Sequence, residues 1–193
     1  MVAGSRVSQT FISLRHRNFR LWFNGQLVSL IGTWMQSTAQ GYLIYTLTQS
    51  PTMLGLVGFA NGIPVWLFSL YGGVISDHFP RRKILLITQS SMMVLALILA
   101  TLTFTNTVQP WHVIVLAFLL GTANAFDSPV RQSFVVEMVS KEDLTNAIAL
   151  NSTVFNLGTI VGPTVAALVY AWLGPGWCFT INAISFIPVL IAL

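Results

Sequence analysis

The ionisable residues of this 193-residue chain gather in short clusters that flank long apolar stretches. One cluster holds Asp77, Arg81 and Arg82, and a second holds Asp127 and Arg131, which are four residues apart and share one helix face. A carboxylate at the edge of a membrane is costly without a partner, so these acids and arginines could pair across helix ends. The alternative is a plain group of charges that stops membrane insertion, and the spacing alone leaves both interpretations open.

Uncharged polar side chains lie inside the apolar stretches, where each needs a hydrogen-bond partner. Each could bond a neighbouring helix, and together they could line a path for a polar or amphiphilic solute. No Asp, Glu, Lys or Arg lies near the middle of any apolar stretch. The candidate residues for the cavity wall are Asn24, Gln26, Trp34, Gln36, Gln40, Asn124, Asn151 and Asn156.

The sequence lacks the residue patterns of enzymes and metal sites. Its single cysteine, Cys178, permits no disulfide within the chain and no cysteine metal cluster. An intramembrane protease would need a Gly-x-Ser-Gly sequence with a helical histidine, or paired membrane aspartates, and neither pattern occurs. His112 has no nucleophile to activate near it in sequence. We therefore expect that the protein is not an enzyme and that it binds no metal and no cofactor.

The composition indicates a membrane protein. Hydrophobic residues make up 54% of the chain and charged residues 7%, against about 45–50% and 25% in a soluble domain. With 9 Lys and Arg against 5 Asp and Glu, the chain has too few cations for a nucleic-acid surface. Windows of about 20 apolar residues cross a lipid bilayer as helices. Six such windows are predicted, at 21–47, 52–76, 84–105, 111–129, 146–172 and 177–193.

The basic residues indicate how these windows are threaded. All of them fall before the first window or after the second and fourth, while the connections 48–51, 106–110 and 174–176 carry no charge. Because cytoplasmic loops hold the excess of Lys and Arg, we expect a multi-pass protein of the plasma (inner) membrane with a cytoplasmic N-terminus. Residues 1–20 are then a basic cytoplasmic segment, and 21–193 a six-helix transmembrane bundle. The sixth window has no polar exit, so we expect the chain to be cut within its sixth helix.

The fifth window carries small residues at helical spacing. Gly158, Gly162 and Ala166 are four residues apart, and Pro163 adds a bend. A stripe of this kind lets a second helix approach closely. A bent helix with a smooth face could also rock against its neighbour during transport. The window 52–76 contains a similar stripe of small residues, so both windows carry these two interpretations.

Residues 73–83, GVISDHFPRRK, resemble the loop signature between the second and third helices of the major facilitator superfamily. Four positions match that signature, whereas His78 and Pro80 replace its usual arginine and glycine. In the family, this loop forms a cytoplasmic latch with the other half of the transporter. An acid at the inner end of the fourth helix joins the latch, and Asp127 stands at that position. The latch residues implied by the resemblance are Gly73, Asp77, Arg81, Arg82, Asp127 and Arg131.

Two further stretches carry the same resemblance. The stripe formed by Gly158, Gly162, Pro163 and Ala166 is similar to the helix-five signature of the superfamily's antiporters, with alanines in place of a final glycine pair. Residues 15–55, and the runs at 125–134 and 146–152, resemble the exporter subgroup that includes the enterobactin exporter and macrolide-type efflux proteins. The resemblance implies an all-α membrane fold in which six helices, arranged as two three-helix inverted repeats, form the N-terminal bundle. It also implies a C-terminal six-helix half as a partner.

The resemblance and the cavity residues together predict a secondary active exporter. We expect it to move small amphiphilic molecules, such as siderophores or drugs, by alternating access coupled to the proton gradient. An importer or uniporter on the same fold, and a half-size transporter working as a homodimer, are the alternatives. The direction of transport in inverted vesicles and the sequence that follows residue 193 would distinguish these possibilities.

Overall fold

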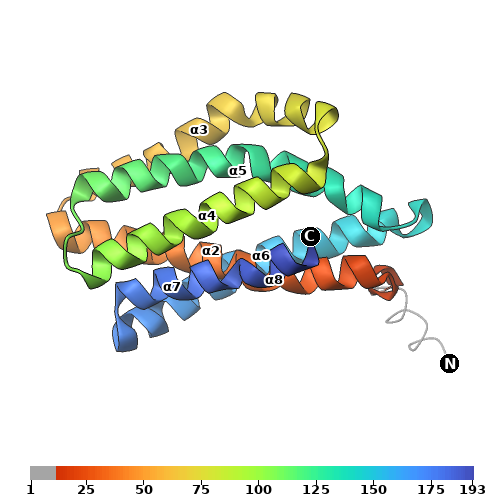
Figure 1. The fold of residues 1–193 in the computed structure, drawn as a ribbon. Helices are drawn as coiled ribbons and strands as arrows, with labels where there is room; N and C mark the ends of the chain where they lie inside the picture. Colours follow the sequence, from red (N-terminus) through yellow and green to blue (C-terminus); the bar gives the residue numbers. More distant parts are fainter. Residues whose placement is uncertain (1–11) are drawn as a thin grey trace.

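A computed structural model describes residues 12–193 of the chain, apart from the side chains of Ser76 and Asp77. Every regular element in this described part is a helix (Figure 1). The elements are η1 (Ile12–Arg15), α2 (Arg17–Thr48), α3 (Pro51–His78), α4 (Arg81–Phe104), α5 (Pro110–Met138), η2 (Lys141–Asp143), α6 (Leu144–Leu173), α7 (Pro175–Ser185) and α8 (Ile187–Ala192).

Prolines set several of the helix ends. The helices α3, α5 and α7 begin at Pro51, Pro110 and Pro175. At the first position of a helix the backbone N–H has no partner within the helix, so its absence in proline costs nothing there. The predicted sixth window forms two short helices, which part at Phe186. Because Pro188 cannot donate to the carbonyl four residues earlier and its ring clashes with that carbonyl, the helix is interrupted there.

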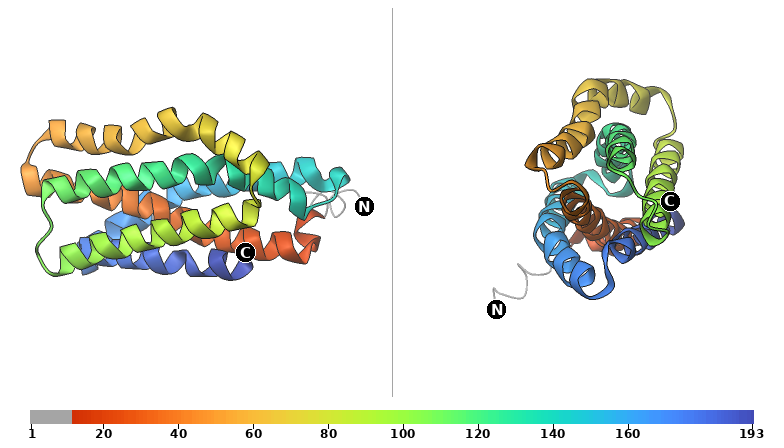
Figure 2. Two further views of the ribbon diagram at one scale, coloured as in Figure 1. Left: turned by 45° about the horizontal axis from the view of Figure 1, so that its top comes forward. Right: turned by 90° about the vertical axis from the view of Figure 1, so that its left-hand side faces the viewer.

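The helices run up and down and pack as a bundle in which distant parts of the sequence lie side by side. The helix α2 packs along α6, and α3 packs along α5 (Figures 1 and 2). The helix α4 contacts α5 on one side and α7 on the other, and both α7 and α8 also contact α2. The first, fifth and sixth helical segments therefore meet, although the 95 residues from 49 to 143 separate α2 from α6 in the sequence.

One end of the bundle holds most of the positive charge. The turn between α3 and α4 and the turn between α5 and α6 both lie at the end where α2 begins (Figure 2). We call it the basic end. Its cations are Arg15, Arg17, Arg20, Arg81, Arg82, Lys83 and Lys141.

Two large apolar clusters hold the two ends of the bundle, and a small third cluster of Met92, Leu120 and Phe186 lies between them beside buried polar residues. The cluster at the basic end is built around Phe19, Trp22 and Leu85, and the cluster at the opposite end around Leu99 and Phe179. Apart from Gln40, the buried polar residues of α2, α4, α5 and α7 fall between the two large clusters. These residues are Gln26, Ser29, Gln36, Thr88, Gln89, Asp127, Asn182 and Ser185. The interior of the bundle therefore holds polar side chains beside apolar ones in the middle of its length.

The outer surface is apolar, as contact with lipid requires. Trp66 and Trp172, for example, are 86% and 81% exposed. By length and composition, five helical segments of the described part are apolar enough to cross a membrane. They are Pro51–Ile75, Arg81–Phe104, Pro110–Met138, Lys141–Leu173 and Pro175–Ala192. The all-helical architecture is confirmed, whereas α2 is not among these five, and the count of six spans stays a prediction.

Candidate functional site

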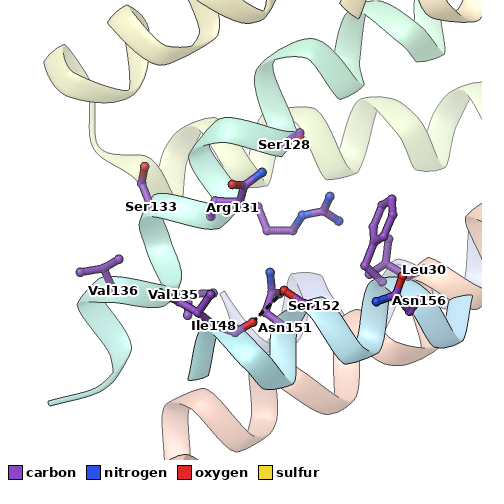
Figure 3. A pocket seen from close by; sticks show the side chains of 12 residues that line it. Leu30, Ser128, Arg131, Ser133, Val135, Val136, Ile148, Asn151, Ser152 and Asn156 are labelled. Carbon is purple, nitrogen blue, oxygen red and sulfur yellow. Dashed lines mark hydrogen bonds between the residues drawn. The ribbon is translucent and has the colours of Figure 1, made fainter. Parts of the chain in front are cut away.

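A cavity of about 710 Å³ lies between α5 and α6, toward the basic end (Figure 3). Binding sites for small molecules typically have volumes of about 300–1,000 Å³. Its wall mixes amides, hydroxyls and apolar side chains with one charged residue, Arg131. The lining residues are Leu30, Ser128, Arg131, Gln132, Ser133, Val135, Val136, Ile148, Asn151, Ser152, Phe155 and Asn156.

A second cavity of about 390 Å³ continues from the first toward the middle of the bundle. The two cavities share Leu30, Ser128, Arg131 and Phe155 in their walls. The second is lined in addition by polar residues from α2, α3, α4 and α5. These polar residues are Ser29, Thr33, Ser37, Asn61, Gln89, Asn124 and Asp127. A polar space therefore leads from the basic end into the interior, and Arg131 stands where its two parts meet.

Asp127 is buried in the wall of the inner cavity, with only 1% of its surface exposed. One carboxylate oxygen accepts hydrogen bonds from the Thr88 hydroxyl at 2.8 Å and from the Gln89 side-chain amide at 2.9 Å. The other lies 3.8 Å from Nε of Arg131, which is an ion-pair distance but not a hydrogen bond. Neutral donors on α4 therefore satisfy much of this carboxylate.

Arg131 projects from α5 into the space between α5 and α6 (Figure 3). Its side chain is 14% exposed. One terminal nitrogen donates to the side-chain oxygen of Gln26 on α2 at 3.3 Å. A guanidinium has five N–H donors, so this bond and the ion pair with Asp127 leave donors of Arg131 directed at the cavity.

The course of α5 places these side chains. Asn124, Ser128 and Arg131 follow one another at helical spacing and share one face of the helix. Pro129 lies inside α5 and cannot donate to the carbonyl of Ala125. That carbonyl oxygen packs against Gly72 of α3, where a Cβ atom would stand only 2.7 Å away. The helices α3 and α5 can therefore approach closely at the level of the cavity.

Half of the residues predicted for the cavity wall line one of the two cavities. Trp34 and Asn124 lie in the wall of the inner cavity, and Asn151 and Asn156 in the wall of the outer one. The amide oxygen of Gln26 holds Arg131 in place. Its amide nitrogen is buried without a hydrogen-bond partner among the described residues.

The remaining predicted amides lie elsewhere. The side-chain oxygen of Gln36 accepts a 2.7 Å hydrogen bond from Asn182 on α7, and Gln40 donates to the carbonyl of Val113 on α5 at 3.1 Å. Both glutamines therefore join helices. Asn24 is exposed on α2 near the basic end.

The residues predicted for the latch are divided among different partners. Arg81 forms an ion pair with Glu137 of α5 at 2.5 Å. Asp127 contacts Arg131 and α4, so the described contacts do not join Arg81 to Asp127. Arg82 is exposed, and the side chain of Asp77 lies outside the described part. Around Gly73 a Cβ atom would meet open space. The latch itself stays a prediction.

The small residues of α6 pack directly against α2. A Cβ atom at Gly158 would stand 2.9 Å from the Trp34 ring, and one at Gly162 would collide with the Cβ atom of Trp34. Ala166 is buried at 1% exposure in the same seam, and Pro163 lies inside the helix. This arrangement agrees with the interpretation of the stripe as a packing surface. Its role in antiport stays a prediction.

A second buried carboxylate, Asp143, joins the chain's N-terminal segment to the turn between α5 and α6. It accepts from Arg15 at 2.9 Å, from His16 at 2.8 Å and from the Ser140 hydroxyl at 3.2 Å. The Ser13 hydroxyl donates to the backbone carbonyl of Asp143 at 2.9 Å. No local pattern in the sequence points to this cluster, because His16 and Asp143 are separated by 127 positions. By contrast, the helical spacing that places Asn124 and Arg131 on one face could have identified Arg131 as a cavity residue.

Comparisons with known proteins agree with this architecture. The chain is 29% identical over 176 residues to the staphyloferrin A transporter of Staphylococcus aureus, which covers 90% of this chain and 44% of the relative. It is 26% identical to macrolide efflux protein A of Streptococcus pyogenes, covering 91% and 43%, and 23% identical to the enterobactin exporter EntS of Shigella flexneri, covering 91% and 44%. The chain therefore spans less than half the length of these curated relatives.

These relatives are named as a transporter, an efflux protein and an exporter. A family model described as transmembrane secretion effector matches residues 8–193, nearly the whole chain. Both findings confirm the resemblance read from the signature residues. This chain belongs to the transmembrane secretion effector family of the major facilitator superfamily.

Proposed function

We propose that this chain is the N-terminal six-helix bundle of a secondary active exporter that moves small amphiphilic molecules by alternating access. The observation that carries the proposal is the pair of polar cavities inside a bundle whose outer surface is apolar. A polar interior is costly in a membrane and marks a path for solutes or ions. The relatives named as siderophore and macrolide transporters support small-molecule cargo.

The helix α2 serves as the first of the six spans. Its composition is less apolar than that of the other long helices because it carries several glutamines. Gln26, Gln36 and Gln40 are only 2–3% exposed, however, so they face the interior of the bundle. The side of α2 that faces lipid carries residues such as Leu21 and Val28, which are half exposed. With 32 residues, α2 is longer than the roughly 20 that a span needs.

The basic end faces the cytoplasm, since excess Lys and Arg stay on that side of a membrane. The outer cavity then opens toward the cytosol, which is the side from which an exporter takes its cargo. A second six-helix half completes the transport path, and the chain's share of its relatives' length supports this. On α3, Gly58 and Gly62 have open space where a Cβ atom would lie, and such a surface suits close packing of another helix.

The proton gradient drives the transport. Within the described part, Asp127 is the acid in contact with the cavities, and its place beside Arg131 in the wall of the inner cavity makes it the candidate for coupling transport to the gradient.

The test is transport by the full-length protein in inverted membrane vesicles. We expect uptake of radiolabelled erythromycin or enterobactin that depends on an imposed proton gradient and stops when a protonophore is added. Vesicles with the Asp127→Asn variant serve as the matched control and should lose the gradient-driven component. Uptake of neither compound above the level of empty vesicles, or uptake that ignores the protonophore, would overturn the proposal.

A further inference from the structure

The outer cavity has a single charged residue in its wall, and that residue is a cation. Arg131 is the only ionisable group among the twelve lining residues. We propose that this cavity binds an acidic group of the transported solute, and that Arg131 is the residue that recognises it. This proposal rests on the proposed export function and narrows its cargo to acidic amphiphiles.

The contacts of Asp127 explain why the guanidinium of Arg131 still presents positive charge to the cavity. The carboxylate points toward α4, where Thr88 and Gln89 bind one oxygen at 2.8 and 2.9 Å. Its second oxygen stays 3.8 Å from Nε of Arg131. The pair is neutral as a whole, but its negative pole is buried at 1% exposure, whereas its positive pole reaches the cavity. An anion in the cavity therefore meets the guanidinium first.

The guanidinium also has the geometry to hold a carboxylate or a similar oxyanion. Its planar set of donors can bind two oxygens side by side. Gln26 of α2 accepts a hydrogen bond from one terminal nitrogen, which restricts the orientation of the group. Because Gln26 is 2% exposed and is packed between helices, the arginine is oriented before any solute arrives.

The remaining wall suits the uncharged part of such a solute. Asn151 and Asn156 of α6 offer amide donors and acceptors, and Phe155 and Leu30 offer apolar surface. A basic amphiphile would find no carboxylate among the described residues of this wall, since its lining includes no acid and Asp127 lines only the inner cavity. The cavity therefore favours acidic over basic amphiphiles of the same size.

Charge-selective labelling of a cysteine tests this inference without any transport. The substitution Ser152→Cys places a thiol in the cavity wall and removes only a hydrogen bond within α6, from the hydroxyl to the carbonyl of Ile148. Cys178 is fully buried and gives little background. The full-length protein, with its other cysteines replaced, is purified in a neutral detergent. It is then reacted with sulfonatoethyl methanethiosulfonate, an anion, or with trimethylammonioethyl methanethiosulfonate, a cation.

We expect the ratio of the anionic to the cationic labelling rate at Ser152→Cys to fall about tenfold when Arg131 is replaced by Gln, because a nearby charge attracts one reagent and repels the other. Arg131→Lys keeps the charge and should keep the ratio within about twofold. The matched control is Thr145→Cys, which is exposed on the same helix outside the cavity, where Arg131→Gln should leave the ratio unchanged. Carboxyfluorescein should slow the labelling of Ser152→Cys, whereas rhodamine 123, a cation of similar ring size, should not.

A ratio at Ser152→Cys that is unaffected by Arg131→Gln, or protection by rhodamine 123 rather than by carboxyfluorescein, would overturn the proposal. Elution of Arg131→Gln and Arg131→Lys as single peaks in size-exclusion chromatography verifies that the variants are folded. The labelling experiment needs no proton gradient. Failure to transport erythromycin or enterobactin would therefore refute the export function, whereas the charge preference of the cavity is tested by the labelling rates alone.

Discussion

The two buried carboxylates in the described part of the chain are both well hidden but are held in different ways. Asp127 in the middle of the bundle is 1% exposed, and Asp143 at the basic end is 4% exposed. Asp143 is bound at short range by Arg15 and His16, at 2.9 and 2.8 Å. Asp127 is bound at short range only by neutral groups, and its arginine stands 3.8 Å away.

This difference assigns different tasks to the two sites. A carboxylate that binds cations directly neutralises their charge. It also joins the segments that carry these residues, here η1 and the turn before α6. A carboxylate that is solvated by hydroxyl and amide donors leaves its arginine available to a ligand. The first arrangement is suited to holding the bundle together, and the second to recognition within the cavity.

Asp127→Asn should have the largest effect. It leaves the buried guanidinium of Arg131 without a counter-charge, which costs about 3 kcal/mol of stability in comparable sites. We expect a lower midpoint of thermal unfolding of the full-length protein in detergent, and loss of transport. The double variant with Arg131→Gln removes both charges and should recover more than half of the lost stability while remaining inactive. Equal instability of the single and double variants would show that the charge of Arg131 is not the cause.

Asp143→Asn should have an intermediate effect that stays local. Losing the carboxylate frees Arg15 and His16 and loosens the start of α2, so amide hydrogen exchange in residues 12–20 should become about tenfold faster. Transport should persist at a reduced rate. The matched control is Glu142→Gln, an exposed neighbour whose loss should leave exchange unchanged. Acceleration that spreads to α4, or equal acceleration in both variants, would contradict a local tether.

Glu137→Gln should have the smallest effect, because it removes an ion pair near the surface. The side chains of Arg81 and Glu137 are 28% and 51% exposed, and pairs of this kind contribute about 0.5 kcal/mol, which salt screens further. The midpoint of thermal unfolding should fall slightly at low ionic strength and match the wild type at high ionic strength. If the midpoint of thermal unfolding fell as far as in Asp127→Asn, the degree of burial would not explain the relative size of the effects at the three carboxylates.

The sequence predicts the helices of this bundle better than the contacts between them. The apolar windows mark α3, α4 and α6 to within a few residues, because hydropathy over a long segment is a local property. The window 111–129 ends too early, since α5 continues through Pro129 to Met138. A proline inside a membrane helix is tolerated where packing satisfies the freed carbonyl.

Single polar residues are harder to interpret from the sequence. Gln36 and Asn156 look alike as amides in apolar stretches, yet Gln36 bonds to Asn182 on another helix and Asn156 lines the cavity. Only the packing of distant segments decides between these outcomes. The family resemblance implies that Arg131 belongs to a cytoplasmic latch, which stays a prediction, and the resemblance gives no sign that its side chain also enters the cavity beside α6.

The most direct test of the account is the binding of two dyes of opposite charge to the purified full-length protein, followed by fluorescence anisotropy. If the charge of Arg131 reaches the cavity, carboxyfluorescein should bind about fivefold or more tightly than rhodamine 123, and Arg131→Gln should abolish that preference. Equal affinities in the wild-type protein, or tighter binding of rhodamine 123, would show that Asp127 neutralises Arg131 and would contradict the account.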